Sequence, residues 1–144
     1  MADIVIVSEQ IDIEIQVTSS EYWAERTLFY LGKMFVDQLK PGEDYQKLEK
    51  CIHVGILNFT LFDDEEYYSR FHFWSDQGRK MYSDKFEIHT LELPKLAKHE
   101  YPETELLKWL QFINAESKEE FEMAAEKSEY IKKAYEDLNR ISAD

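Results

Sequence analysis

The fold of this chain is decided by the stretch Ile11-Asp12-Ile13-Glu14-Ile15-Gln16. Its isoleucines alternate strictly with acidic or amide residues, and this period of two is typical of a β-strand. Successive side chains of a strand point to opposite faces, so the three polar residues share one face and the isoleucines share the other. The alternation alone leaves two interpretations open. The polar face is either solvated, as on an ordinary half-buried strand, or part of a functional site.

A second short strand is predicted immediately upstream, at residues 3–7. Two strands so close together form a β-hairpin. With a two-residue loop, counting outward places Val5 opposite Glu14 and Asp3 opposite Gln16. Asp3 would then lie on the polar face, about 7 Å from Glu14 along the diagonal, a gap that two carboxylates sharing one cation can close. A three-residue loop would turn Asp3 to the other face.

A long helix is predicted after these strands. It begins at Ser19 or Ser20, either of which can cap it, and it ends near Leu39, before a Pro-Gly pair. Apolar side chains occupy most of its circumference, which predicts a largely buried helix. Its polar stripe consists of Tyr22, Arg26, Tyr30 and Lys33. This stripe is either the solvent edge of the helix, where long cationic side chains usually end, or the lining of a site.

Three more strands are predicted downstream, at residues 51–59, 67–74 and 86–93. The first is apolar with little alternation, as expected of a central strand covered on both faces. The helix before it fits a βαβ crossover from the strand of residues 11–16. The histidines have neither the spacing of a zinc site nor a cysteine cluster beside them, so we interpret all four as structural or surface residues: His53, His72, His89 and His99.

Composition shifts after about Ala97, and two amphipathic helices are predicted there. The first follows Pro102, and the second opens at the capping box Ser117-Lys118-Glu119-Glu120. An apolar seam with spacings of three and four runs along the second helix: Phe121, Ala124, Ser128, Ile131, Tyr135 and Leu138. The large apolar residues expected to bury against each other or a second chain are Trp109, Phe112, Phe121 and Ile131. We therefore predict an α/β core over residues 1–97 and a helical appendage over residues 98–144, packed on the core or on a partner chain.

Composition also limits the classes of protein to which this chain can belong. With 144 residues, 44% of them hydrophobic, the chain is long and apolar enough to fold around a real core. The single cysteine, Cys51, permits no internal disulfide and fits a reducing compartment, so we expect the cytoplasm. No apolar run approaches the ~20 residues of a membrane span, so we expect no membrane partner. A net charge of −13 repels phosphates, so any contact with nucleic acid must use a local patch.

Several separated segments carry a resemblance that spans nearly the whole chain. In order they are Asp3, Asp12 to Thr18, Arg26 to Tyr30, Gly42 to Tyr45, Ile56 to Phe59 and Leu91 to Lys95, with the helix that contains Trp109 after them. Together they resemble the PD-(D/E)XK nuclease family transposases, also called recombination-promoting nucleases. Each segment alone is a weak signal, but their number and order make the resemblance fairly specific.

This resemblance implies a restriction-endonuclease-like α/β fold, a mixed sheet flanked by helices. It also implies a divalent cation, Mg²⁺ or Mn²⁺, and an endonuclease that hydrolyses phosphodiester bonds of DNA in mobile-element recombination. Carried over by position, Asp3 and Glu14 match the two metal-binding acids of the family. Gln16 matches a frequent substitute for the lysine of the family motif. DNA, the cation and a second copy of the chain are the partners we expect.

The physical chemistry of these residue types agrees with that expectation. Two carboxylates on adjacent strands can hold Mg²⁺, which polarises a phosphoryl oxygen and activates water. Gln16 has neither a titratable proton nor a charge, so Arg26 or Lys33 would have to stabilise the charge that develops on the phosphate. We therefore count Arg26 and Tyr30 among the candidate catalytic residues. Asp12 is either an auxiliary metal ligand or a residue that orients the ligands.

The chain departs from the resemblance at its beginning. Family members usually carry a helix and a strand before the position of Asp3, whereas this sequence starts at Met1. We therefore expect either a copy truncated at its N-terminus or a sequence trimmed there, and catalytic activity is not assured in either case. The alternative to a nuclease is a catalytically inactive remnant that serves as an oligomeric interaction module, because an exposed apolar sheet face favours self-association.

Overall fold

The computed structural model describes residues 4–7, 10–16, 18, 19 and 21–142, with the side chains of residues 4–7 excepted. The chain divides into two compact units, Met1–Lys95 and Leu96–Asp144, which are treated separately below. Within the described residues, no helix is long and apolar enough to cross a membrane.

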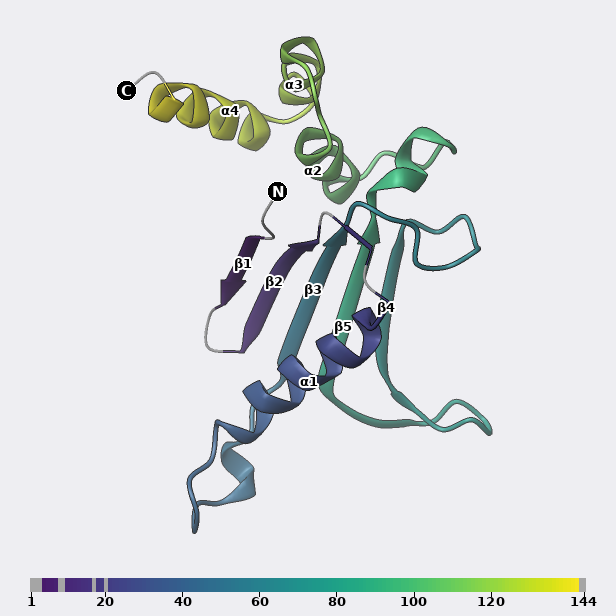
Figure 1. Cartoon of the computed structure of the whole chain (residues 1–144), viewed down its shortest axis with the longest axis vertical. Helices are drawn as coiled ribbons and strands as arrows, with labels where there is room; N and C mark the ends of the chain where they lie inside the picture. Colours follow the sequence, from purple (N-terminus) through teal and green to yellow (C-terminus); the bar gives the residue numbers. More distant parts are fainter. Residues whose placement is uncertain (1–3, 8–9, 17, 20, 143–144) are drawn as a thin grey trace. The chain divides into compact units, whose positions relative to one another are not determined.

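A mixed sheet forms the first unit (Figure 1). Among the described residues it has five strands, β1 (Ile4–Val7), β2 (Ile11–Gln16), β3 (Cys51–Leu57), β4 (Tyr68–Trp74) and β5 (Met81–Glu92), in the order β1-β2-β3-β5-β4. Strands β2, β3 and β5 run parallel, while β1 and β4 lie antiparallel to their neighbours. The α/β architecture with a mixed sheet, predicted from the sequence, is confirmed.

The β1–β2 hairpin has the register that a two-residue loop predicts. Val5 pairs with Glu14, and Val7 pairs with Asp12. On its other side β2 pairs in parallel with β3, which places Asp12 opposite His53 and Glu14 opposite Gly55. The strand that carries the acidic residues is therefore an interior strand of the sheet.

Helix α1 (Trp23–Val36) connects β2 to β3 as a βαβ crossover, as predicted. The prediction that it begins at Ser19 or Ser20 is wrong, because the N-cap is Tyr22 and makes no side-chain cap. The start is fixed instead by packing. Trp23 lies directly over Gly55, where an added Cβ would come within 2.5 Å of the indole ring, so this close approach requires glycine.

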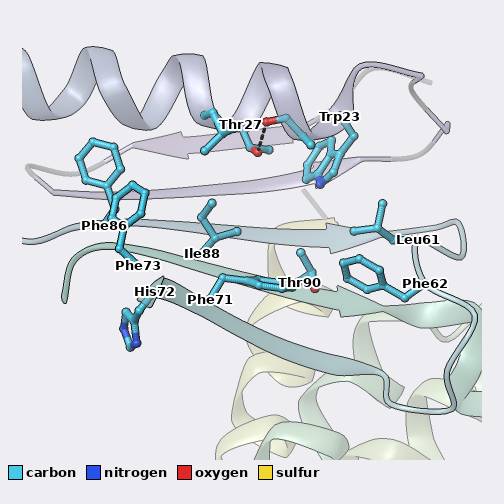
Figure 2. Close-up of a pocket in the computed structure, with 12 residues that line it drawn as sticks. Trp23, Thr27, Leu61, Phe62, Phe71, His72, Phe73, Phe86, Ile88 and Thr90 are labelled. Atoms are coloured by element: carbon cyan, nitrogen blue, oxygen red, sulfur yellow. Dashed lines mark hydrogen bonds between the residues drawn. The ribbon is translucent and has the colours of Figure 1, made fainter. Parts of the chain in front are cut away.

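The helix is buried along one face only, which contradicts the prediction of a largely buried helix. Trp23, Thr27 and Leu31 are its buried residues, whereas Leu28 and Phe29 are exposed. An apolar pocket of about 290 Å³ lies between this helix and strands β4 and β5. Figure 2 shows aromatic rings from both strands around it, and His72 pointing away from it.

A buried ion pair fixes the loop that follows β3. Glu92, at the end of β5, accepts hydrogen bonds from the backbone N–H groups of Leu61 (2.6 Å) and Phe62 (3.0 Å). Lys95 Nζ lies 3.1 Å from Glu92 Oε2 and 2.9 Å from Asp64 Oδ1. Burial would lower the pKa of Lys95, but hydrogen bonds to these two carboxylates raise it above its ordinary value. The lysine is therefore a structural cation.

The second unit contains three helices among its described residues, α2 (Glu105–Ile113), α3 (Lys118–Ala125) and α4 (Glu129–Ser142). Thr104 caps α2, and Ser117 caps α3 as predicted. The predicted single second helix is in fact two, because the chain turns at residues 126–128. Phe121, Ala124, Ile131 and Tyr135 of the predicted seam do pack together, whereas Leu138 is 47% exposed. Their cluster consists of Phe112, Ala124, Ala125 and Ile131, with Trp109, Phe121 and Tyr135 packed against it.

Candidate functional site

Strand β2 buries its polar face and leaves its isoleucine face less covered. Asp12, Glu14 and Gln16 are only 5%, 1% and 4% exposed, whereas Ile11 is 39% exposed. The interpretation of a solvated polar face is therefore wrong. Burying carboxylates costs free energy unless charges or hydrogen bonds compensate them, so this face needs an explanation beyond core formation.

Arg26 of α1 compensates two of these side chains at once. Its guanidinium lies 2.5 Å from Glu14 Oε1 and donates a hydrogen bond to Gln16 Oε1 at 2.8 Å. Gln16 in turn donates from Nε2 to the carbonyl of Thr18 at 2.8 Å, which fixes the amide orientation. The ring of Tyr30 lies one helical turn further along, 5.6 Å from the guanidinium carbon. Three predicted site residues from two elements therefore meet, with Tyr30 as an aromatic platform.

Asp12 is held by a partner that the sequence interpretation missed. His53 of β3 places Nδ1 3.1 Å from Asp12 Oδ2, and Trp23 contacts the imidazole edge to face. Burial lowers the pKa of His53 despite the opposing effect of Asp12, so the neutral imidazole donates from Nδ1. The parallel pairing of residues 11–16 with residues 51–57 is the signal that could have identified His53.

One oxygen of Asp12 remains available. Among the described residues, Asp12 Oδ1 is buried and has no hydrogen-bond partner. Asp12 also lines a groove of about 470 Å³ together with Tyr30 and Lys33 of the polar stripe. The interpretation of the polar stripe as the lining of a site therefore fits these two residues, whereas Tyr22 does not line the groove. An unsatisfied buried acceptor beside a groove is the kind of position that a cation or a hydrogen-bond donor fills.

Asp3, the remaining predicted ligand, lies outside the described residues. Within the described part of the chain, no group of three or more His, Cys, Asp or Glu side chains could by itself hold a metal ion. The donors present are nevertheless hard oxygen atoms on a single strand face, which is the ligand type that Mg²⁺ and Mn²⁺ prefer. Asp12 and Glu14 therefore fit a divalent cation by chemistry, as part of a ligand set.

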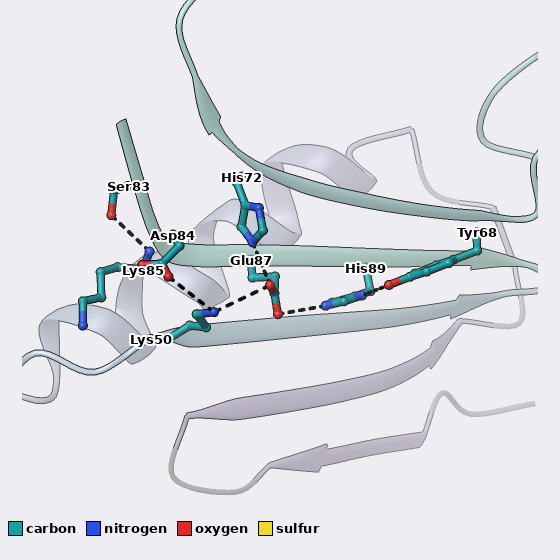
Figure 3. Close-up of polar contacts among 8 residues, drawn as sticks. All are labelled: Lys50, Tyr68, His72, Ser83, Asp84, Lys85, Glu87 and His89. Carbon is teal, nitrogen blue, oxygen red and sulfur yellow. Dashed lines mark hydrogen bonds and ion pairs between the residues drawn. The ribbon is translucent and has the colours of Figure 1, made fainter. Parts of the chain in front are cut away.

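A second polar cluster lies on the other face of the sheet (Figure 3). Glu87 accepts hydrogen bonds from His72 Nε2 (2.7 Å) and His89 Nε2 (3.0 Å), and Lys50 Nζ lies 3.8 Å away. Tyr68 extends this hydrogen-bond network, because its hydroxyl lies 2.7 Å from His89 Nδ1. Burial would raise the pKa of Glu87, but the two histidines and Lys50 outweigh it and lower that pKa to about 2. Every carboxylate oxygen here has a partner, which distinguishes this cluster from Asp12.

Comparison with known proteins gives a family match over almost the whole chain. The family model described as PD-(D/E)XK nuclease family transposase matches residues 3–144. No curated protein and no solved structure matches the chain. The family supports a nuclease-type function, and nucleases of this kind typically use divalent metals and act on DNA. Because the match covers almost the whole sequence, the chain belongs to the PD-(D/E)XK nuclease family transposases.

Proposed function

We propose that this protein is a metal-dependent endonuclease that hydrolyses phosphodiester bonds of DNA at the polar face of β2. Asp3, Asp12 and Glu14 would hold Mg²⁺ or Mn²⁺, and Gln16, Arg26 and Tyr30 would act beside them. The observation that carries the proposal is the burial of all three polar β2 side chains beneath α1, in place of the isoleucines. A strand selected only for stability would bury its apolar face.

The chain's own residues have separable roles in this proposal. A bound divalent cation would polarise the scissile phosphate and lower the pKa of water. Gln16 would orient the attacking water through Oε1, once Arg26 leaves it, while Nε2 stays bonded to the Thr18 carbonyl. Arg26 would move from Glu14 toward the phosphate and stabilise the developing negative charge. Its side chain is 31% exposed, so the guanidinium already reaches solvent beside the buried face.

His53 is a positioning residue in this arrangement. It fixes one oxygen of Asp12 through Nδ1, so the other oxygen faces the ligand position. Such support from behind a ligand commonly changes metal affinity by about 10–100-fold. Trp23, which packs closely on Gly55, contacts His53 in turn.

Plasmid nicking tests the proposal. In Mg²⁺ or Mn²⁺ the protein should nick supercoiled DNA, and Glu14→Ala should abolish nicking, since it removes a ligand that no neighbour on the strand replaces. Gln16→Lys should preserve or raise the rate, because lysine supplies both a hydrogen-bond donor and a charge. Glu119→Gln, which changes an exposed carboxylate on α3, is the control. Equal nicking by the wild type and Glu14→Ala, in nuclease-free preparations, would exclude this site.

A specific observation also favours the second candidate function, an inactive interaction module. The outer side of α1 exposes Phe29 and Val36, which are 68% and 65% exposed. Apolar side chains gathered on one helix are typical of a contact surface. Sedimentation equilibrium distinguishes the two functions when combined with nicking. An oligomer that Phe29→Asp dissociates, without any metal-dependent cleavage, would place this second function first.

A further inference from the structure

The strands β4 and β5 continue past the main sheet as a hairpin, here called the β4–β5 arm and defined as residues 73–85 (Figure 1). Its turn is closed by Ser75, whose N–H donates to the Lys80 carbonyl and whose hydroxyl accepts from the Lys80 N–H, both at 2.9 Å. Gly78 and Arg79 both have positive φ, which gives the tip a defined shape. The arm is therefore an ordered projection.

The arm is locally positive in an acidic protein. It carries three cations, Arg79, Lys80 and Lys85, against two acids, Asp76 and Asp84, while the whole chain has a net charge of −13. All three cations are exposed, and none makes an ion pair with another described residue. Asp84 is partly neutralised, since its carboxylate lies 3.7 Å from Lys50. The arm is thus a local patch that attracts phosphates in a field that otherwise repels them.

Aromatic side chains stand between these cations. Tyr82 is 89% exposed and Trp74 is 51% exposed, with Phe73 and Met81 also open to solvent. Trp74 and Arg79 line a hollow of about 560 Å³ whose other walls are Ser75 and Asp76. An exposed indole face with a guanidinium beside it is a platform on which an unpaired base stacks. The Asp76 carboxylate can accept a hydrogen bond from a base amino group at the same place.

The base of the arm is anchored, so the platform is organised before any ligand arrives. Glu87 ties β4 to β5 through His72, and Lys50 joins Asp84 and Glu87 from the start of β3 (Figure 3). His72 also contacts the Trp74 ring at a centroid distance of 6.4 Å. This contact limits the side-chain entropy that Trp74 would lose on binding, which favours affinity.

We propose that the β4–β5 arm binds an unpaired DNA strand, with Arg79 and Lys80 on the phosphates and a base stacked on Trp74. This inference rests on the proposed function for the choice of DNA, but it assigns a separate surface. Paired bases in a duplex do not offer their faces to a side chain, so exposed aromatic residues favour the single strand. The arm would thus hold single-stranded or unwound segments of DNA on the protein.

Fluorescence anisotropy with a labelled mixed-sequence oligonucleotide, in EDTA, tests this assignment. EDTA prevents cleavage and removes the metal site from the measurement, so the arm and the nuclease proposal can fail independently. The wild type should bind the single strand more tightly than the duplex of the same sequence. Trp74→Ala should weaken single-strand binding about tenfold or more, as expected for the loss of one stacked base. Tyr82→Ala, at a nearly fully exposed position, should weaken it without affecting the fold.

The double variant Arg79→Ala/Lys80→Ala should reduce the slope of log affinity against log salt by about 1.4, since each phosphate contact contributes about 0.7. Lys132→Ala/Lys133→Ala on α4 removes the same charge elsewhere and is the matched control. Mn²⁺ affinity should be unchanged in all arm variants. Equal loss in the control pair, unchanged binding in Trp74→Ala, or a preference for duplex would overturn the proposal. Tighter binding to RNA of the same sequence would overturn the choice of DNA.

Discussion

The β2–α1 interface and the α2–α4 cluster are both buried, but the first consists of polar and charged side chains and the second of apolar ones. Beneath α1 lie Asp12, Glu14 and Gln16, held by Arg26 and His53. The helical cluster is instead aromatic and aliphatic, with Phe112 in edge contact with Phe121 and Tyr135. The first region buries charged groups where the dielectric constant is low, whereas the second only removes apolar surface from water.

We interpret this difference as one of role: the β2 residues serve function, and the residues of the helical cluster stabilise the fold. In the helical cluster the sequence pattern and the observed burial agree at Phe112, Ala124 and Ile131, which are buried, and differ at Leu138, which is exposed. On β2 they disagree, since the face that stability favours is the less covered one. Such conflicts between local pattern and burial concentrate at functional sites. We therefore expect the two regions to respond differently to the same kind of substitution.

The largest expected change in stability is in the helical cluster. Ile131 is fully buried, so Ile131→Ala should lower the free energy of unfolding by about 2–5 kcal/mol. Ile141→Ala changes the same residue type on the same helix at a position that is 69% exposed. Its effect should stay within about 0.5 kcal/mol. Urea unfolding followed by circular dichroism measures both, and equal losses would show that the cluster is not a core.

An intermediate effect is expected at Glu87, a buried carboxylate outside the candidate site. Its folded pKa of about 2 lies below the ordinary 4.5, so its contribution to stability is complete above about pH 4.5 and is lost as pH falls toward 2. The contribution should be about 2–3 kcal/mol at neutral pH, from about 1.4 kcal/mol per pKa unit, with some reduction by solvent. Thermal unfolding of the wild type and Glu87→Gln across this window measures it. A stability difference that does not change with pH would contradict the assignment.

The smallest expected effect tests most closely whether the polar residues of the β2–α1 interface contribute to stability. Arg26→Met leaves Glu14 buried without its guanidinium and should cost about 1–2 kcal/mol, less than a fully buried pair because Arg26 reaches solvent. Adding Glu14→Leu should restore the stability of the wild type or exceed it, because an apolar pair fills the same space without desolvation cost. Urea unfolding of both variants tests this. A double variant less stable than Arg26→Met would show that the pair exists for stability.

Much of the fold follows from pattern alone. Counting outward from a two-residue loop gives Val5 opposite Glu14, and the apolar run at residues 51–57 gives a parallel interior strand. The start of α1 does not follow, since the packing of Trp23 on Gly55 fixes it and no cap signals it. The break between α3 and α4 at residues 126–128 cannot be predicted from the sequence pattern either, because the apolar spacing continues across it.

The sequence predicts which residues belong to the candidate site, but it does not predict how they are arranged. Alternation shows that Asp12, Glu14 and Gln16 share a face, but it cannot show which face a helix will cover. The spacing of Arg26 and Tyr30 indicates a stripe, and only the crossover geometry turns that stripe toward β2. His53 lies 41 residues from Asp12, so the contact depends on strand pairing rather than on any local spacing.

Mn²⁺ titration calorimetry tests most directly whether the buried polar face of β2 is a metal site. The wild type should bind Mn²⁺ weakly through Asp3, Asp12 and Glu14. Glu14→Gln keeps the shape of the side chain and removes its charge, so it should weaken binding at least about tenfold, while Glu119→Gln on α3 should have no effect. Circular dichroism establishes that both variants are folded. Unchanged Mn²⁺ affinity in folded Glu14→Gln would contradict the account.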